Sequence, residues 1–257
     1  MRPMAYVPGV ALLAALVAGC SAGSGAGDSG ADSKPGSPTV TAAPPGKYRT
    51  LPQSCRAVPR ATLKDLLPGA EDLPEEQQEK LYEGTPAVTY DNDRKVGCRW
   101  KSEAPDASRN LSIDFERVVS YDPAVSDDDR AREVFAKQQD TALPQMAGQS
   151  GGTPSGSSST GSSATPTTGT DGAGSPDDLL PRLLDGLGDA AFLDDALTRA
   201  GSTAQHRTVS VVFRTSNVIV TVRYTEQPAR VTEVPDSKEL QEKAQALARN
   251  LSETLSE

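Results

Sequence analysis

The sequence is poor in the residues that build common catalytic and binding sites. It has one histidine, three cysteines and only 4% aromatic residues. A Ser-His-Asp triad would have to use His206, which stands between Gln205 and Arg207 near an expected strand start, where an exposed surface histidine is the simpler interpretation. A zinc site would depend on carboxylates. The scarcity of tryptophan and tyrosine argues against a carbohydrate-binding face of exposed rings.

The chain also has fewer basic than acidic residues. The chain has 26 Lys and Arg against 35 Asp and Glu, a formal net charge of −9. Nucleic acid is therefore not an expected partner, because binding to phosphate backbones needs a basic surface. The charge equally disfavours attraction to anionic lipid, and it serves mainly solubility.

The sequence has no apolar run long enough to span a membrane. The longest covers 7–18, about 12 residues after Arg2, which fits a signal-peptide core and falls short of a spanning helix. Val17-Ala18-Gly19-Cys20 resembles a bacterial lipobox, so we expect 1–19 to be removed and Cys20 to carry lipid. The alternative is an ordinary signal peptide with a chance cysteine. Stable anchoring needs two or more acyl chains. The expected partner is thus the cell membrane, and the lipid would hold the chain on its extracytoplasmic face.

Two low-complexity stretches divide the rest. Residues 20–49 are rich in Gly, Ser, Ala and Pro and predict a disordered tether with a reach of about 30 Å. Residues 149–176 are similar, with Asp171 as their only charge. This stretch either separates two domains or interrupts one. We favour an insert within one domain formed by 50–148 and 177–257, because neither flank looks complete.

Lipidation of Cys20 would leave Cys55 and Cys98 as a pair. Outside the cytoplasm such a pair most often forms a disulfide, which contributes about 4 kcal/mol in the chain-entropy view. Two buried free thiols are the alternative.

The hydrophobic pattern predicts an α+β fold, an antiparallel sheet packed with helices, without a βαβ rhythm. Helices are expected over 59–67, 74–82, 126–143, 177–184 and from Asp236 to near the end, and strands over 96–100, 111–115, within 187–195, and in a hairpin of 209–213 and 218–224. Cys98 and Trp100 would share one strand face.

The hairpin has apolar residues on both faces. Val212 and Ile219 lie with Arg214, Thr221 and Arg223 on the face opposite the main apolar stripe. This face is therefore either covered by the helices of 59–67 and 126–143 or available to a partner, and we favour cover by these helices.

Several catalytic patterns match by letter and fail on context. G-x-S-x-G at 148–152 opens the low-complexity insert, whereas a nucleophile elbow lies between a strand and a helix. Gly186, Gly188 and Ala191 fit a loose dinucleotide pattern but lie between an expected helix and a strand, the reverse of the required order.

The acidic clusters have structural explanations. Residues 127–129 fit the first turn of a helix capped by Ser126. Residues 91–93 run into Arg94 and Lys95 in place of further calcium ligands. Asp194 and Asp195 would point to opposite faces of a strand and would not converge. No catalytic, metal or cofactor-binding residue is therefore predicted.

The ordered set of motifs resembles one family. The segments are the lipobox, the low-complexity tether, LPQSCRAVPRATLKDLLP, GCRW, LGDAAF and VVFRTSNVIVTVRY before a terminal helix. Together they are similar to the actinobacterial secreted lipoproteins grouped as domain of unknown function 3558, over most of 51–257. The resemblance implies an extracytoplasmic α+β domain with a Cys55–Cys98 bridge, and it carries no catalytic residues.

The expected function is a non-enzymatic binding or accessory module of the cell envelope, with an envelope protein or a small ligand as its partner. Two alternatives are an envelope hydrolase that uses carboxylates and a sensor module of a membrane system.

Overall fold

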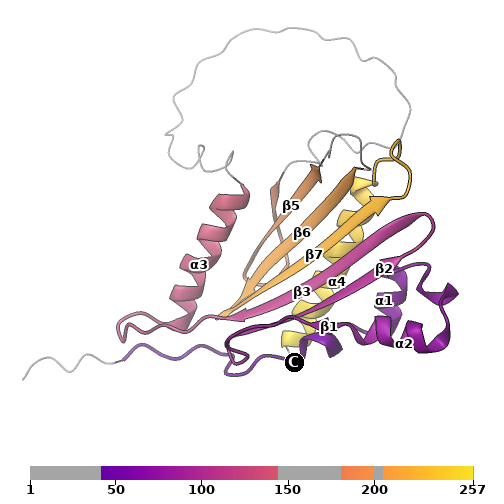
Figure 1. The fold of residues 1–257 in the computed structure, drawn as a ribbon. Helices are drawn as coiled ribbons and strands as arrows, with labels where there is room; N and C mark the ends of the chain where they lie inside the picture. Colours follow the sequence, from indigo (N-terminus) through magenta and orange to yellow (C-terminus); the bar gives the residue numbers. More distant parts are fainter. Residues whose placement is uncertain (1–41, 144–180, 199–204, 257) are drawn as a thin grey trace, which may run out of the picture. The chain divides into compact units, whose positions relative to one another are not determined.

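Within the described residues, seven antiparallel strands form one sheet in the order β1-β2-β3-β7-β6-β5-β4 (Figure 1). The computed structural model describes residues 42–143, 181–198 and 205–256. Their elements are η1 (Ser54–Arg56), α1 (Arg60–Leu66), η2 (Ala70–Asp72), α2 (Glu75–Glu83), β1 (Thr85–Pro86), β2 (Lys95–Glu103), β3 (Ala107–Arg117), α3 (Asp127–Ala142), β4 (Arg182–Leu184), β5 (Ala190–Thr198), β6 (His206–Thr215), β7 (Val218–Pro228) and α4 (Ser237–Ser256). They confirm the predicted α+β class. No helix among the described residues is long and apolar enough to cross a membrane.

The two sequence halves share the centre of the sheet. β3, from the first half, pairs along its whole length with β7 of the second half, from Ala107 opposite Pro228 to Arg117 opposite Val218. All the described residues belong to one compact unit, Val40–Glu257, while the other unit, Met1–Thr39, lies outside them. The predicted insert at 149–176 also lies outside the described residues.

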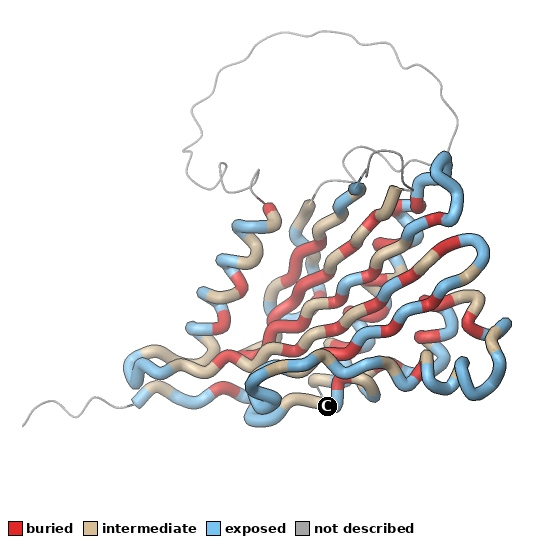
Figure 2. The backbone as a smooth tube through the Cα atoms, viewed as in Figure 1, coloured by how far each residue is buried: buried red, intermediate tan, exposed pale blue. Residues whose placement is uncertain are grey.

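One face of the sheet carries the main core. Alternation along the strands places Cys98, Trp100, Ile113, Val220 and Phe213 on this first face, all at most 2% exposed. The apolar stripes of α1 and α4 pack against it, and Figure 2 shows the buried residues along the central strands. The shared face predicted for Cys98 and Trp100 is confirmed.

α3 covers part of the opposite, second face. Phe135 of α3 packs against Phe192 of β5, with ring centroids 5.5 Å apart, and Val212 and Ile219 complete this smaller core. The prediction that α3 covers this face is confirmed. The prediction that α1 also covers it was wrong, because Leu63 and Leu66 of α1 pack into the first-face core.

Some elements differ from the sequence prediction. Arg182–Leu184, expected as the end of a helix, form the edge strand β4 and pair with β5. Pairing with an open sheet edge outweighs the weak helical pattern of this short leucine-rich segment. The β6–β7 turn consists of Ser216 and Asn217, because Thr215 still pairs with Val218.

The end of the predicted tether is attached to the domain. The Asn217 side chain accepts a hydrogen bond from the Tyr48 amide and donates to the Tyr48 carbonyl, each at 2.9 Å. The Gly46 amide donates to Asp127 at 2.9 Å, and the Tyr48 hydroxyl donates to the Leu255 carbonyl at 2.8 Å. The expectation of disorder up to residue 49 is thus corrected for residues 42–48, which we call the N-terminal segment, because buried polar partners hold them.

Candidate functional site

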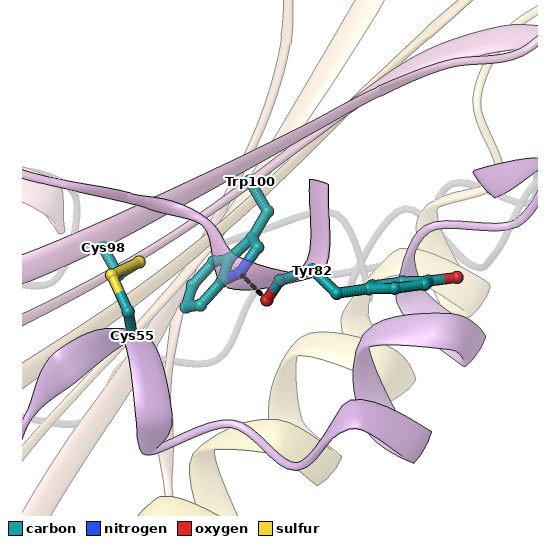
Figure 3. The surroundings of a disulfide bond; sticks show 4 residues. All are labelled: Cys55, Tyr82, Cys98 and Trp100. Atoms are coloured by element: carbon teal, nitrogen blue, oxygen red, sulfur yellow. Dashed lines mark hydrogen bonds between the residues drawn. A yellow bond between two sulfur atoms is a disulfide. The ribbon is translucent and has the colours of Figure 1, made fainter. Parts of the chain in front are cut away.

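The predicted cysteine pair is bonded. Cys55 and Cys98 form a disulfide that joins η1 to β2 (Figure 3). Trp100 lies beside it on β2 and donates its indole N–H to the Tyr82 carbonyl at 3.2 Å. Gly84, with φ of +70°, closes this cluster, since an added Cβ would lie 2.6 Å from the Cys98 sulfur. These residues hold α2 and η1 against the sheet. The lipid-attachment residue Cys20 lies outside the described residues.

The acidic clusters at 127–129 and 91–93 act within the structure. Ser126 caps α3, accepting from the Asp129 amide at 3.1 Å, and Asp127 accepts from the Ser120 amide at 2.7 Å. Asp128 accepts from the Ser216 hydroxyl. Asp91 pairs with Arg94 at 3.3 Å. Within the described residues, no group of three or more His, Cys, Asp or Glu could hold a metal ion.

The glycine and histidine patterns lack the structural context that their motifs require. Gly186 and Gly188 both have positive φ and form the turn between β4 and β5, so no helix follows them. His206 is the first residue of β6 and pairs with Thr198. The 148–152 motif lies outside the described residues.

Asp194 and Asp195 point to opposite faces of β5. Asp195 lies on the first face with its side chain 0% exposed. It accepts two hydrogen bonds from Arg207, at 2.9 and 3.1 Å, one from Gln241 at 2.7 Å, and one from Ser237. This network fastens the start of α4 to β5 and β6, which is a structural role.

Asp194 lies instead in a cleft between α3 and the second face, which we call the α3 cleft. The cleft has a volume of about 760 Å³. Its apolar floor comes from Phe192, Val212 and Ile219. From α3, residues at helical spacing form the opposite wall: Val134, Lys137, Gln138, Thr141 and Ala142.

Both signs of charge surround this floor. The acidic residues are Asp114, Glu116 and Asp194, and the basic residues are Lys95, Lys137 and Arg223. Strand register places Asp194, Ser210 and Arg223 in one row across β5, β6 and β7. Burial raises the pKa of the Asp194 carboxyl above its ordinary value, Asp195 adds to this, and Arg223 lowers it. A carboxyl perturbed in this way within a cleft is typical of a functional site.

The separation of the carboxyl groups limits the chemistry of the cleft. Asp194 is on β5, whereas Asp114 and Glu116 are on β3, three strands away in the sheet. A strand spacing of 4.8 Å puts about 14 Å between their backbones. Glycosidases hold their two carboxylates about 5 to 9.5 Å apart, so this spacing sets Asp194 apart from the other two. Asp114 and Glu116, two residues apart on β3, are closer together, with about 7 Å between their backbones. The arrangement suits binding of a small amphiphilic molecule, with an apolar body on the floor and charged groups at the rim.

Sequence reasoning found only part of this cleft. Alternation in the hairpin already pointed to Val212, Ile219 and Arg223 on one face. Lys95, Asp114 and Glu116 gave no local signal, because only the pairing of β2 with β3 and of β3 with β7 brings them to the same cleft.

No protein-family model and no curated protein matches the chain.

Proposed function

We propose that this chain is a lipid-anchored binding or accessory module on the extracytoplasmic face of the cell membrane, and that the α3 cleft holds its ligand. The lipobox at residues 17–20 supports the anchor, with Cys20 as the attachment residue. Membership of the secreted-lipoprotein family that the sequence resembles is part of the same proposal.

The observation that carries the binding role is the α3 cleft itself. Its volume falls within the range of small-molecule sites, about 300–1,000 Å³. An apolar floor with a few charged groups at the rim is the usual composition of such sites. The ligand class that fits is a small amphiphile with an anionic group, because Arg223 makes no ion pair among the described residues and faces the cleft.

The distance of Asp194 from the other cleft carboxyls favours binding over hydrolysis at this residue. An envelope hydrolase needs an acid and a base on either side of one bond. Asp194 has no second carboxylate on β6 or β7 in the cleft lining. The binding proposal therefore accounts for more of the cleft than the hydrolase alternative.

Fractionation tests the anchor. Cys20→Ala should move the protein from the membrane fraction to the medium or leave an uncleaved precursor. Mature, unacylated Cys20→Ala protein that stays in the membrane fraction would contradict the anchor.

A fluorescence titration tests the cleft. The probe is anilinonaphthalene sulfonate, which combines an apolar ring system with one anionic group. Thr221 of β7 also lines the cleft. We expect Thr221→Trp, which places a large side chain there, to raise the dissociation constant of the dye at least about tenfold. Ser108→Trp is the matched control, since Ser108 lies on the same face of β3 outside the cleft lining.

The near-ultraviolet circular dichroism of both variants shows whether packing is intact, because this dye also binds loosened proteins. Equal dye affinity in the folded Thr221→Trp variant would place the dye elsewhere and reject the cleft as the ligand site.

A further inference from the structure

A second pocket continues along the same sheet face beyond Arg223. It has a volume of about 470 Å³ and lies over β2, β3 and β7. We call it the arginine pocket. Its polar side chains include Arg99, Lys101, Asn110, Ser112, Arg223 and Thr225.

Hydrogen-bond donors line the arginine pocket and no carboxylate does. This composition stands out in a chain with a net charge of −9. Glu103 neutralises Lys101 through an ion pair outside the lining. Neither the Arg99 nor the Arg223 side chain makes an ion pair or a hydrogen bond within the part of the chain that the structure describes. The pocket therefore presents two guanidinium groups: that of Arg99, and that of Arg223, which also acts on Asp194 of the neighbouring cleft at longer range.

Strand register puts these two groups on either side of one hydroxyl. Arg99 pairs with Ser112 across β2 and β3, and Ser112 pairs with Arg223 across β3 and β7. The two arginine backbones are thus two strand spacings, about 10 Å, apart. Long arginine side chains from both sides can reach one anion above Ser112, and guanidinium groups bind tetrahedral oxyanions with paired hydrogen bonds.

The layer beneath the pocket is rigid. Trp100 and Leu111, on the same strands, point to the first face and are at most 2% exposed. The Cys55–Cys98 disulfide holds the strand that carries Arg99. A preorganised backbone lowers the entropic cost of binding.

We propose that the arginine pocket binds the phosphate group of a small soluble phosphate ester. Arg99 lines the arginine pocket and not the α3 cleft, whereas Arg223 borders both, so Arg99 is the residue that distinguishes the two sites. The net charge of −9 opposes docking of the domain on an anionic bilayer, so the phosphate is that of a soluble molecule.

Calorimetric titration of the full chain with glycerol phosphate at low salt tests the proposal. The wild type should show saturable binding, and Arg99→Gln and Arg223→Gln should each weaken it at least about tenfold, as loss of a charge-assisted contact predicts. Arg249→Gln is the matched control: it removes the same charge from an exposed arginine of α4, outside the pocket lining, and should bind as the wild type does.

Three results would overturn the proposal. They are no saturable binding by the wild type, equal weakening in Arg249→Gln, or binding to vesicles of anionic phospholipid without binding to glycerol phosphate. Retention of dye affinity in Arg99→Gln would show that the α3 cleft works independently, so failure of one site is distinguishable from failure of the other.

Discussion

Asp194 and Asp195 are neighbours in the chain, yet β5 directs them to opposite faces and gives them opposite roles. Asp195 accepts hydrogen bonds from Arg207, Gln241 and Ser237 beneath α4. Asp194 faces the α3 cleft, where burial and then Asp195 raise its pKa, and Arg223 opposes this only in part. This pair allows two adjacent substitutions to be compared.

Replacing Asp194 should stabilise the protein at neutral pH. Its pKa is raised in the folded state, so the folded protein holds this proton more tightly than the unfolded chain does. The charged carboxylate therefore costs stability above its folded pKa, and the cost vanishes below the unfolded pKa. Asp194→Asn should raise the free energy of unfolding at pH 7 by less than about 1 kcal/mol, with no gain near pH 3. Urea denaturation at both pH values measures this. A loss of stability at pH 7 would contradict a raised pKa of Asp194 in the folded protein.

Replacing Asp195 should have the opposite effect. Asp195→Ala leaves Arg207, whose side chain is 7% exposed, without its anionic partner. Removing one partner of a buried ion pair costs about 3–5 kcal/mol. The same urea experiment should show a loss of about 3 kcal/mol at pH 7. A change as small as that expected for Asp194→Asn would mean that the buried network contributes little.

At the scale of elements, the β6–β7 turn attaches the N-terminal segment. Asn217 is 0% exposed and bonds both Tyr48 backbone groups. Its amide also donates to the Val118 carbonyl at 3.4 Å, at the end of β3. One side chain thus connects the turn, the N-terminal segment and the chain that leads to α3.

Asn217→Ala should release this segment. We expect a loss of about 1–3 kcal/mol, because buried backbone groups lose their partners, together with faster hydrogen exchange at the Tyr48 amide. The exposed Asn250→Ala change on α4 is the control and should alter neither quantity. Unchanged exchange at Tyr48 in Asn217→Ala would show that other contacts hold the segment.

Local patterns predicted many of these elements correctly. Three features follow from residues close together in sequence: the 209–224 hairpin, the Ser126 cap and the helix start at Asp236, whose carboxylate accepts from the Glu239 amide at 2.7 Å. The strand β4 and the cleft residues of β3 do not, because they depend on pairing between distant segments. α1 was assigned to the wrong face for the same reason: its leucine stripe shows that one side is buried but not against which face.

At the scale of the whole molecule, the sheet makes the two halves interdependent. β3 and β7 pair over eleven positions, from Ala107 opposite Pro228 to Arg117 opposite Val218, at the centre of the seven-stranded order. Separating 50–148 from 177–257 would expose both of these strands and the core beneath them.

The domain should therefore unfold in one step. Trp100 fluorescence, which reports on β2, and backbone circular dichroism, which reports on all elements, should give the same denaturation midpoint. The fragments 50–148 and 177–257, expressed separately, should each lack a cooperative transition. Two midpoints in the intact chain, or a fragment that folds alone, would contradict the one-domain account.

The central claim, that the α3 cleft holds the ligand of an anchored binding module, is tested most directly by native mass spectrometry of the protein extracted from its own membrane. We predict a noncovalent small-molecule adduct on the wild type and on Ser108→Trp that is absent from Thr221→Trp. The same adduct on Thr221→Trp at equal occupancy, or a wild type without any adduct, would contradict the claim.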